Sequence, residues 1–276
     1  MLRGGVDHDV LRVTSIMRFE NQVVWITGAS SGIGEALAVA WSREGARLVL
    51  SARNAAELER VRASCDHPDR HLVLPLDLVK FETMPAAVEK VLKEMGRIDV
   101  VVHSGGVSQR SLVTETSLET DRAIMDLNYF GTVALTKAVL PTMLARRSGQ
   151  IVSISSVVGY VSTPLRSAYS ASKHALHGFF DSLRAEVAKD GIAVTVVCPG
   201  YIKTNVSENA LRGDGSRYGK MDDTHVKAML PDKAAPRIID GVAKRKAEVR
   251  VGGKEIHAIL LQRLFPSLVA RMVRMK

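Results

Sequence analysis

The sequence predicts an α/β fold: one doubly wound domain with a seven-stranded parallel sheet and helices on both faces. Short runs of apolar, β-branched residues alternate along the chain with segments whose apolar residues recur every three to four positions. The runs are almost continuously apolar, which is typical of strands buried on both faces. Parallel neighbours need right-handed crossover connections, and the intervening helices supply them. No sequence repeat or internal linker divides the chain.

The first half of the chain alternates regularly. Runs of Val, Ile and Leu predict four strands, at 23–27, 48–51, 71–75 and 98–102. The segments between them have helical spacing of Leu, Val and Ala, which predicts helices at 35–44, 55–64 and 85–95.

The second half continues the pattern with longer helices. Apolar residues at helical spacing predict helices at 118–145 and 168–189. Runs rich in Val and Ile predict strands at 150–155, 192–198 and 248–251. Between the last two strands, residues 201–227 are rich in Gly, Ser, Asn and Asp, so we expect a mobile excursion that serves as a substrate lid.

The ends of the chain differ from this core. Residues 1–18 are charged and lack an apolar stretch of signal-peptide length, so we expect a flexible extension and no secretion signal. Residues 19–252 form the predicted catalytic domain. Residues 253–276 form a basic tail with an apolar stripe at Ile256, Ile259, Leu260 and Leu264.

Composition and charge exclude several classes of protein. The chain of 276 residues is 46% hydrophobic and 24% charged, which argues against disorder and long coiled coils. The chain has no window of eighteen apolar residues, so no membrane-spanning helix is predicted. The net charge of the chain is +9. Residues 227–276 contain twelve basic and four acidic residues and so carry +8 of it. This basic region has Phe265 as its one aromatic residue, so nucleic-acid binding is not expected.

The two cysteines indicate a compartment. Cys65 and Cys198 are too few for a disulfide framework or a zinc cluster, and no metal site is predicted. Cys198 ends an apolar run and is expected to be a buried strand thiol. We therefore expect a reducing, cytoplasmic environment, with the basic tail either solvated or peripheral to an anionic membrane.

A glycine-rich turn follows the first strand and leads directly into a helix. Glycine lets the chain turn tightly and lets backbone approach a pyrophosphate, while free amides at the helix N-terminus attract its negative charge. This position predicts a Rossmann dinucleotide site rather than an empty turn. The residues expected to bind the cofactor here are Gly28, Ser30, Ser31, Gly32, Ile33 and Gly34.

The end of the second strand favours NADP(H) over NAD(H). An NAD site usually has an acidic residue there to bind ribose hydroxyls, whereas this chain has Ala52 followed by Arg53. A guanidinium suits a 2′-phosphate, although Arg53 could also be a solvated charge. Asp77 could accept a hydrogen bond from the adenine amino group or make a turn. Ser104, Gly105 and Gly106 would let backbone pass close to the cofactor.

Tyr169, Lys173 and Ser156 form the candidate reactive group. A Tyr and a Lys four residues apart share one helix face, and a nearby ammonium lowers the pKa of a phenol from its ordinary value of about 10. The phenol would then be a proton donor closer to working pH. Ser156 ends the fifth strand, where its hydroxyl could bind a carbonyl oxygen, and Ser155 is its nearest competitor.

These residues together resemble the short-chain dehydrogenase/reductase superfamily over roughly residues 19–251. The features that carry the resemblance, all in the expected order, are Thr27–Gly34, Asn128, Ser156, Tyr169 with Lys173, and Pro199-Gly200 with Thr204. The resemblance implies that Tyr169 gives or takes the proton, that Lys173 holds the nicotinamide ribose and lowers the phenol pKa, and that Ser156 orients the carbonyl.

The resemblance also implies roles that the residues alone do not suggest. Asn128 would maintain a kinked helix and a water that leads protons to Lys173; from spacing alone it is a polar residue in an apolar helix. Pro199, Gly200, Ile202 and Thr204 would border the cofactor.

The segments 108–111, 127–129 and 171–176 are similar to the branch called dehydrogenase/reductase family member 7. That branch implies lipophilic carbonyl substrates such as steroids, retinoids or aromatic ketones. The family implies a homodimer or homotetramer that pairs through the two long helices. Membrane-bound members of the branch carry an N-terminal anchor, which we do not expect here.

One departure from the family pattern leaves an alternative open. His103-Ser104-Gly105-Gly106 replaces the usual Asn-Asn-Ala-Gly, which puts the side-chain support of the central sheet in doubt. A nucleotide-binding sensor without turnover is therefore a rival to the enzyme. A binding protein that uses its basic tail at a membrane surface is a second rival.

Overall fold

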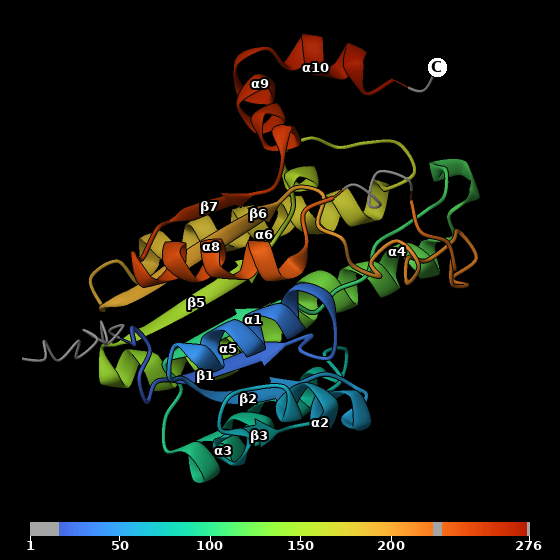
Figure 1. Ribbon diagram of the computed structural model, residues 1–276. Helices are drawn as coiled ribbons and strands as arrows, with labels where there is room; N and C mark the ends of the chain where they lie inside the picture. Colours follow the sequence, from blue (N-terminus) through green and yellow to red (C-terminus); the bar gives the residue numbers. More distant parts are fainter. Residues whose placement is uncertain (1–16, 223–227, 275–276) are drawn as a thin grey trace, which may run out of the picture.

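The computed structural model describes residues 17–222 and 228–274 (Figure 1). Its centre is a seven-stranded, all-parallel sheet with the strand order β3-β2-β1-β4-β5-β6-β7. The strands are β1 Val23–Thr27, β2 Arg47–Ser51, β3 Leu72–Val73, β4 Val100–His103, β5 Gly149–Ile154, β6 Ile192–Pro199 and β7 Glu248–Val251. The predicted fold class is thus confirmed.

The register of the sheet aligns the ends of its central strands. Thr27, the last residue of β1, pairs with Ser51 on one side and His103 on the other. The order of strands reverses between β1 and β4, and ligands of such folds bind outside the carboxyl ends of the strands at this point. The segments that follow β1, β2 and β4 therefore start next to one another.

Helices cover both faces of the sheet. They are α1 Gly32–Arg43, α2 Ala55–Ala63, α3 Met84–Met95, α4 Leu118–Met125, α5 Gly131–Arg146, α6 Ser167–Glu186, α8 Pro231–Ala243, α9 Ala258–Leu264 and α10 Pro266–Met272. Residues of α1, α2 and α8 pack on one face, and residues of α3, α5 and α6 pack on the other. Since successive strand residues point to opposite faces, Val24 and Ile26 join the first layer while Val23 and Trp25 join the second.

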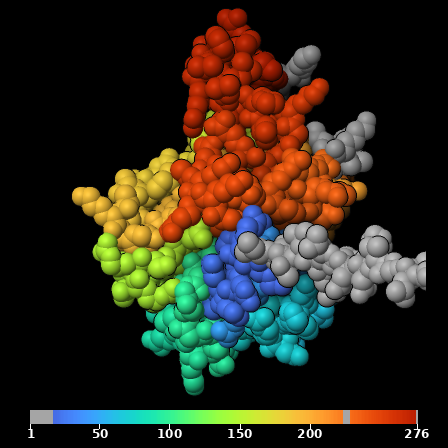
Figure 2. All heavy atoms as spheres, turned by 60° about the vertical axis from the view of Figure 1, so that its left-hand side comes forward, coloured from blue at the N-terminus to red at the C-terminus, as the bar shows by residue number. Residues whose placement is uncertain are grey.

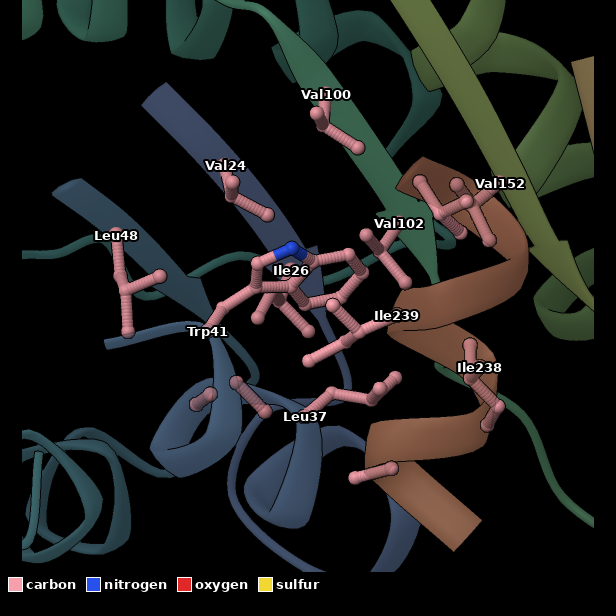
Figure 3. Packing of buried hydrophobic residues seen from close by; sticks show 14 of the residues in the cluster. Val24, Ile26, Leu37, Trp41, Leu48, Val100, Val102, Val152, Ile238 and Ile239 are labelled. Carbon is pink, nitrogen blue, oxygen red and sulfur yellow. The ribbon is translucent and has the colours of Figure 1, made fainter. Parts of the chain in front are cut away.

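Figure 3 shows the first layer from close by. The indole of Trp41 lies between the sheet and α8, near Ile26 and Ile239. Trp41 is fully buried, and Phe19 meets it edge to face with ring centroids 5.8 Å apart. This packing anchors α1, and hence the glycine-rich turn before it, against the sheet.

Two predicted elements need correction, and one helix was not predicted. The helix predicted at 118–145 is interrupted by a π-helical turn, Asp126–Phe130, because its backbone adopts a wider hydrogen-bond pattern between α4 and α5. The strand predicted at 71–75 shrinks to Leu72–Val73 at the sheet edge. Helix α8 was not predicted, because Pro231 and Pro236 obscure its apolar spacing.

The excursion after β6 is more firmly held than expected. Ser207 and Ala210 are fully buried, although this segment was predicted to be mobile and outside the core. Its backbone pairs with the segment after β4: Leu211 N donates to Ser108 O at 2.9 Å, and Arg110 N donates to Leu211 O at 2.8 Å. Residues 223–227 of the predicted lid lie outside the described residues, as do residues 1–16 of the predicted extension.

The tail forms α9 and α10, which stand out from the body of the molecule (Figures 1 and 2). Ile259, one residue of the predicted apolar stripe, is buried and packs on the domain, and Val269 of α10 is also buried. Large apolar side chains remain exposed on it: Leu260, Leu264, Phe265, Leu268 and Met272. Over residues 17–222 and 228–274, no helix combines the length and the apolar character needed to cross a membrane.

Candidate active site

A cavity of about 940 Å³ lies at the carboxyl ends of the strands. It brings together all but two of the residues that the sequence singled out. Those lining it are Gly28, Ser30, Ser31, Gly32, Ile33, Arg53, Asp77, Ser104, Gly105, Gly106, Ser156, Tyr169, Lys173, Pro199, Gly200, Ile202 and Thr204. Gly34 and Asn128 do not line the cavity. Both contact residues that do, Gly34 beside Gly28 and Asn128 beside Val107.

The glycine-rich turn has no room for side chains. Gly28 has φ +66°, and a Cβ built on it would lie 2.7 Å from the backbone nitrogen of Gly105. A Cβ on Gly34 would lie 2.2 Å from the carbonyl oxygen of Gly28. The turn therefore packs directly on the segment after β4 and on the first turn of α1. This close packing brings the amides at the N-terminus of α1 to the cavity, where they can bind an anionic group.

Arg53 and Asp77 lie at the end of the cavity next to β2. Arg53 is exposed and lines the cavity just before α2, whose N-terminus is capped by Asn54 accepting a hydrogen bond from Glu57 N at 3.3 Å. Asp77 accepts a hydrogen bond from Val79 N at 3.3 Å, so its carboxylate also makes a turn. The position of Arg53 suits contact with a group bound at the edge of the sheet.

Lys173 is one turn beyond Tyr169 on α6, and the structure brings the pair together. The Lys173 Nζ atom lies 5.7 Å from the centroid of the Tyr169 ring and donates a hydrogen bond to Ile154 O at 2.9 Å. Lys173 is 6% exposed, and burial lowers its pKa to about 8. The side chain is thus an ammonium near neutral pH with one backbone partner in the described structure.

The electrostatics of Tyr169 differ from the expectation. Burial raises the pKa of its phenol, while a hydrogen bond with Ser156 and the charges of Arg110 and Arg166 lower it. The spacing of Tyr169 and Lys173 predicted a pKa lowered by the lysine, whereas the net shift is upward because burial has the largest effect. In this structure the Lys173 ammonium is turned toward Ile154 O, and the opposing charges come from two arginines instead.

Ser156 rather than Ser155 offers its hydroxyl to the cavity. Ser155 Oγ is buried, hydrogen-bonds to His177 Nε2 at 2.9 Å and donates to Lys173 O at 3.3 Å. Ser156 Oγ accepts a hydrogen bond from Val158 N at 3.3 Å, and Ser156 also hydrogen-bonds to the Tyr169 hydroxyl, so the two hydroxyls lie next to each other at the cavity. Ser156 and Tyr169 can therefore address the same oxygen atom.

Asn128 lies inside the π-helical turn and is fully buried. Its amide exchanges two hydrogen bonds with Val107, at 2.8 and 2.9 Å, and donates to Ser172 Oγ at 3.0 Å. These contacts tie the segment after β4 to α6. The π-helical turn interrupts the helix at Asn128, and the role that the family resemblance implies for this residue stays a prediction.

His103 supports the central sheet where an asparagine was expected. Its side chain is 2% exposed, and its Nε2 atom forms a 2.8 Å hydrogen bond with Thr136 Oγ1 in α5. The Nδ1 atom has no hydrogen-bond partner in the described structure. Burial lowers the pKa of His103 to about 3, so the ring is neutral at physiological pH. His103 thus links the end of β4 to α5, and the effect of the His103-Ser104 pair on the support of the sheet stays a prediction.

A His103→Asn variant should lose less stability in acid than the parent protein. The unfolded chain protonates His103 near pH 6.5 and the folded one only near 3, so stability is present above pH 6.5 and falls as the pH drops. The parent should lose about 2 to 3 kcal/mol of unfolding free energy over the first two pH units. Urea unfolding at several pH values measures this. An exposed control, His257→Asn, should retain the parent slope, and equal slopes in all three proteins would contradict the assignment.

Sequence reasoning missed three residues that organise the site. Gln109 is fully buried, and its Oε1 atom accepts a hydrogen bond from Ala168 N at 2.8 Å at the start of α6. Arg110 and Arg166 line the cavity and are joined by Asp222. Segment 108–111 was singled out only for its similarity to a family branch, and the sequence does not show which side chains Gln109, Arg110 and Arg166 contact.

Comparison with known proteins gives a consistent result. A profile of the family described as short chain dehydrogenase matches residues 22–214. The chain is 47% identical to a dehydrogenase/reductase SDR family protein 7-like of Drosophila melanogaster, covering 91% of this chain and 80% of the relative. It is 42% identical to dehydrogenase/reductase SDR family member 7B of Mus musculus, covering 95% and 83%. A short-chain dehydrogenase structure from Streptomyces avermitilis has a TM-score of 0.78 at 31% identity, covering 91% of this chain and 95% of that one.

Proposed function

The chain belongs to the short-chain dehydrogenase/reductase family and is an oxidoreductase that acts on CH–OH groups, and from this premise we propose that it transfers hydride between NADP(H) and the carbonyl or alcohol carbon of a lipophilic substrate. One observation carries the proposal. Tyr169, Lys173 and Ser156 line the same cavity as the glycine-rich turn, so a reacting carbon and a dinucleotide would share one enclosure.

The cavity wall fits a nicotinamide dinucleotide. A Cβ on Gly28 would fill the space beside Gly105, and a Cβ on Gly106 would lie 2.9 Å from Asn128 Oδ1 and 3.7 Å from Lys173 Nζ. These glycines therefore let the segments that form the wall pack closely, so that their backbone lines the cavity between the N-terminus of α1 and Lys173. When bound, the dinucleotide supplies the hydride chemistry. Backbone amides of the glycine-rich turn would hold its pyrophosphate, and Lys173 would hold the nicotinamide ribose.

The chain's own residues would handle the substrate oxygen. In reduction, the Tyr169 hydroxyl gives its proton to the carbonyl oxygen while the carbonyl carbon receives hydride, which yields an alcohol. Ser156 donates a hydrogen bond to the same oxygen and stabilises the negative charge that develops on it. In oxidation, the Tyr169 phenolate takes the proton back.

Arg53 supports the preference for NADP(H) over NAD(H). An Arg53→Ala variant should raise the Kd for NADPH about tenfold, because an exposed guanidinium–phosphate contact contributes modestly. Binding of NADH, which lacks the 2′-phosphate, should change little. Fluorescence titration with both nucleotides measures this, with Arg43→Ala as a matched control on an exposed arginine outside the cavity wall. Equal weakening of both nucleotides would contradict the preference.

The substrate class rests on apolar lining. Val157, Val158 and Val161 follow Ser156 around the cavity, and Ala258 and Val273 reach it from the tail. Such a wall favours lipophilic carbonyls, which include steroids, retinoids and aromatic ketones. The names of the relatives indicate the branch of the family and do not specify a substrate.

A panel of ketones and aldehydes tests turnover against the rival function of a nucleotide sensor. We expect NADPH absorbance to fall only when protein and a lipophilic carbonyl are both present. A sensor would bind NADPH and leave the absorbance unchanged with every carbonyl. That outcome, with NADPH binding demonstrated, would replace the enzyme by the sensor.

The remaining proposals concern partners and location. We propose a homodimer or homotetramer, as is common in the family, and a cytoplasmic location, which two buried free cysteines support. The exposed apolar side chains of α9 and α10, together with Arg263, Arg271 and Arg274, suit peripheral contact with an anionic membrane. Co-sedimentation with anionic and neutral vesicles measures that contact, and equal pelleting with both would contradict it.

A further inference from the structure

Two arginines that line the cavity with Tyr169 share one carboxylate. Asp222 forms ion pairs with Arg110 and with Arg166, the latter at 3.0 Å between Nη2 and Oδ2. The side chains of Arg110, Asp222 and Arg166 are 5%, 16% and 22% exposed. Charges at this depth are screened weakly by solvent, so their fields reach neighbouring groups.

The three residues come from different parts of the fold. Arg110 follows β4, Arg166 immediately precedes α6, and Asp222 belongs to the segment after β6. Arg110 also donates to Ser108 Oγ at 2.8 Å and lies within 3.4 Å of Ser207 Oγ. Ser111 N donates to Leu165 O at 3.2 Å, which joins the first two segments through their backbones. The cluster therefore joins the segment after β6 to the start of α6.

The same segments place the phenol. Gln109, next to Arg110, accepts hydrogen bonds from Ala168 N at 2.8 Å and Tyr169 N at 3.5 Å. Arg166 lies three residues before Tyr169, and both arginines line the cavity with it. Lys173 Nζ is directed to Ile154 O and lies 5.7 Å from the centroid of the Tyr169 ring, and the guanidiniums of Arg110 and Arg166 add positive charge that lowers the pKa of the phenol.

The cavity is lined by more basic than acidic residues. Among the described residues that line it, five are basic, namely Arg53, Arg110, Arg166, Lys173 and Arg217, and two are acidic, namely Asp77 and Glu255. Asp77 lies near β2 and Glu255 accepts a hydrogen bond from Tyr201 N at 2.9 Å. Within residues 17–222 and 228–274, neither carboxylate forms an ion pair with Arg110 or Arg166, whereas Asp222 pairs with both.

We propose that Arg110 and Arg166, held by Asp222, are positioning residues whose positive charge stabilises the phenolate of Tyr169, so that the segment after β6 takes part in setting proton transfer. The proposal rests on the role of Tyr169 proposed above. The family resemblance attributes the lowering of the phenol pKa to Lys173 of α6. The proposal attributes part of that lowering to Arg110 and Arg166.

Several charged and titratable groups of the described residues enter this balance. Ser156 contributes a hydrogen bond from the end of β5, and Lys173 contributes an ammonium from α6. Arg110 and Arg166 contribute guanidiniums from the two segments that Asp222 joins. Tyr201, in the segment after β6, interacts with the charge of Arg166. Removing a guanidinium raises the pH at which Tyr169 loses its proton, and removing the carboxylate lowers it.

The test compares substitutions of opposite sign. Arg166→Gln should move the deprotonation midpoint of Tyr169 upward by about half a pH unit, and Asp222→Asn should move it downward. Arg166→Lys keeps the charge and should restore the parent midpoint. Arg217→Gln removes a cavity-lining arginine that binds Glu208 O at 3.1 Å, and it should leave the midpoint unchanged. General structural damage would move the Gln and Asn variants in the same direction.

Two readouts separate this inference from the proposed function. Tyrosinate absorbance of the cofactor-free protein, measured against the same protein carrying Tyr169→Phe, gives the midpoint without any turnover. The pH profile of kcat for alcohol oxidation should shift in parallel. Equal midpoints for the parent and Arg166→Gln, or the same direction of shift for Arg166→Gln and Asp222→Asn, would overturn the inference even if the enzyme turns over. Absence of turnover with the expected midpoints would instead count against the proposed function.

Discussion

A Tyr169→Phe variant is expected to bind NADPH as the parent does and to lose about 10²- to 10⁴-fold in kcat, the range that a positioned general acid contributes. The ring is retained, so its packing on α6 and the cavity wall is preserved. Only the hydroxyl that gives the proton to the substrate oxygen is removed. Steady-state reduction of a carbonyl that the parent accepts, together with NADPH titration, measures both effects.

The control for this variant is Tyr218→Phe. Tyr218 lies over the Arg212 guanidinium and does not line the cavity, so its hydroxyl should be dispensable for turnover. Both variants remove one oxygen atom from a tyrosine. Near-normal kcat for Tyr169→Phe would remove this residue from the reaction, and loss of NADPH binding would instead show a fault in the fold of the site.

A Lys173→Met variant is expected to be more stable than the parent near neutral pH and to lose most of its activity. Folding buries the lysine and lowers its pKa from 10.5 to about 8, so below pH 8 the folded protein carries a poorly solvated ammonium. Methionine removes that cost and also the hydrogen bond to Ile154 O. We expect a net gain of about 1 to 2 kcal/mol in unfolding free energy.

The gain should depend on pH in a defined direction. Between pH 8 and 10.5 the folded parent has released a proton that its unfolded chain still binds, so the parent's stability rises with pH. The difference between parent and variant should therefore shrink over this range. Lys137→Met, at an exposed position of α5, should show no such trend. A variant that is less stable than the parent at every pH, by a constant amount, would contradict the buried ammonium.

The fold was largely predictable because its signals are local. Strands such as Val23–Thr27 and Glu248–Val251 were predicted at their observed bounds, since continuous apolar runs mark strands buried on both faces. The interruption at Asp126–Phe130 was not predictable from apolar spacing, because the contacts that stabilise it come from Val107 and Ser172. Helix α8 was missed because two prolines mask a face that packs on α1.

The candidate site was predictable in its members and less so in its electrostatics. The glycine-rich turn and the spacing of Tyr169 and Lys173 are sequence features, and the cavity includes them. The hydrogen-bond partner of Lys173, and the ion pairs of Arg110 and Arg166 with Asp222, depend on which segments the fold brings together. No spacing rule connects residues 110, 166 and 222, because they meet only through the tertiary structure.

The most direct measurement of the central claim follows the hydride. The protein would reduce a lipophilic carbonyl with NADPH deuterated at C4, on the face from which hydride leaves, and mass spectrometry would locate the label. The account predicts deuterium on the carbinol carbon of the product, with the hydroxyl proton drawn from solvent through Tyr169. A product alcohol free of deuterium, formed while deuterated NADPH of either stereochemistry is consumed, would contradict hydride transfer in this cavity.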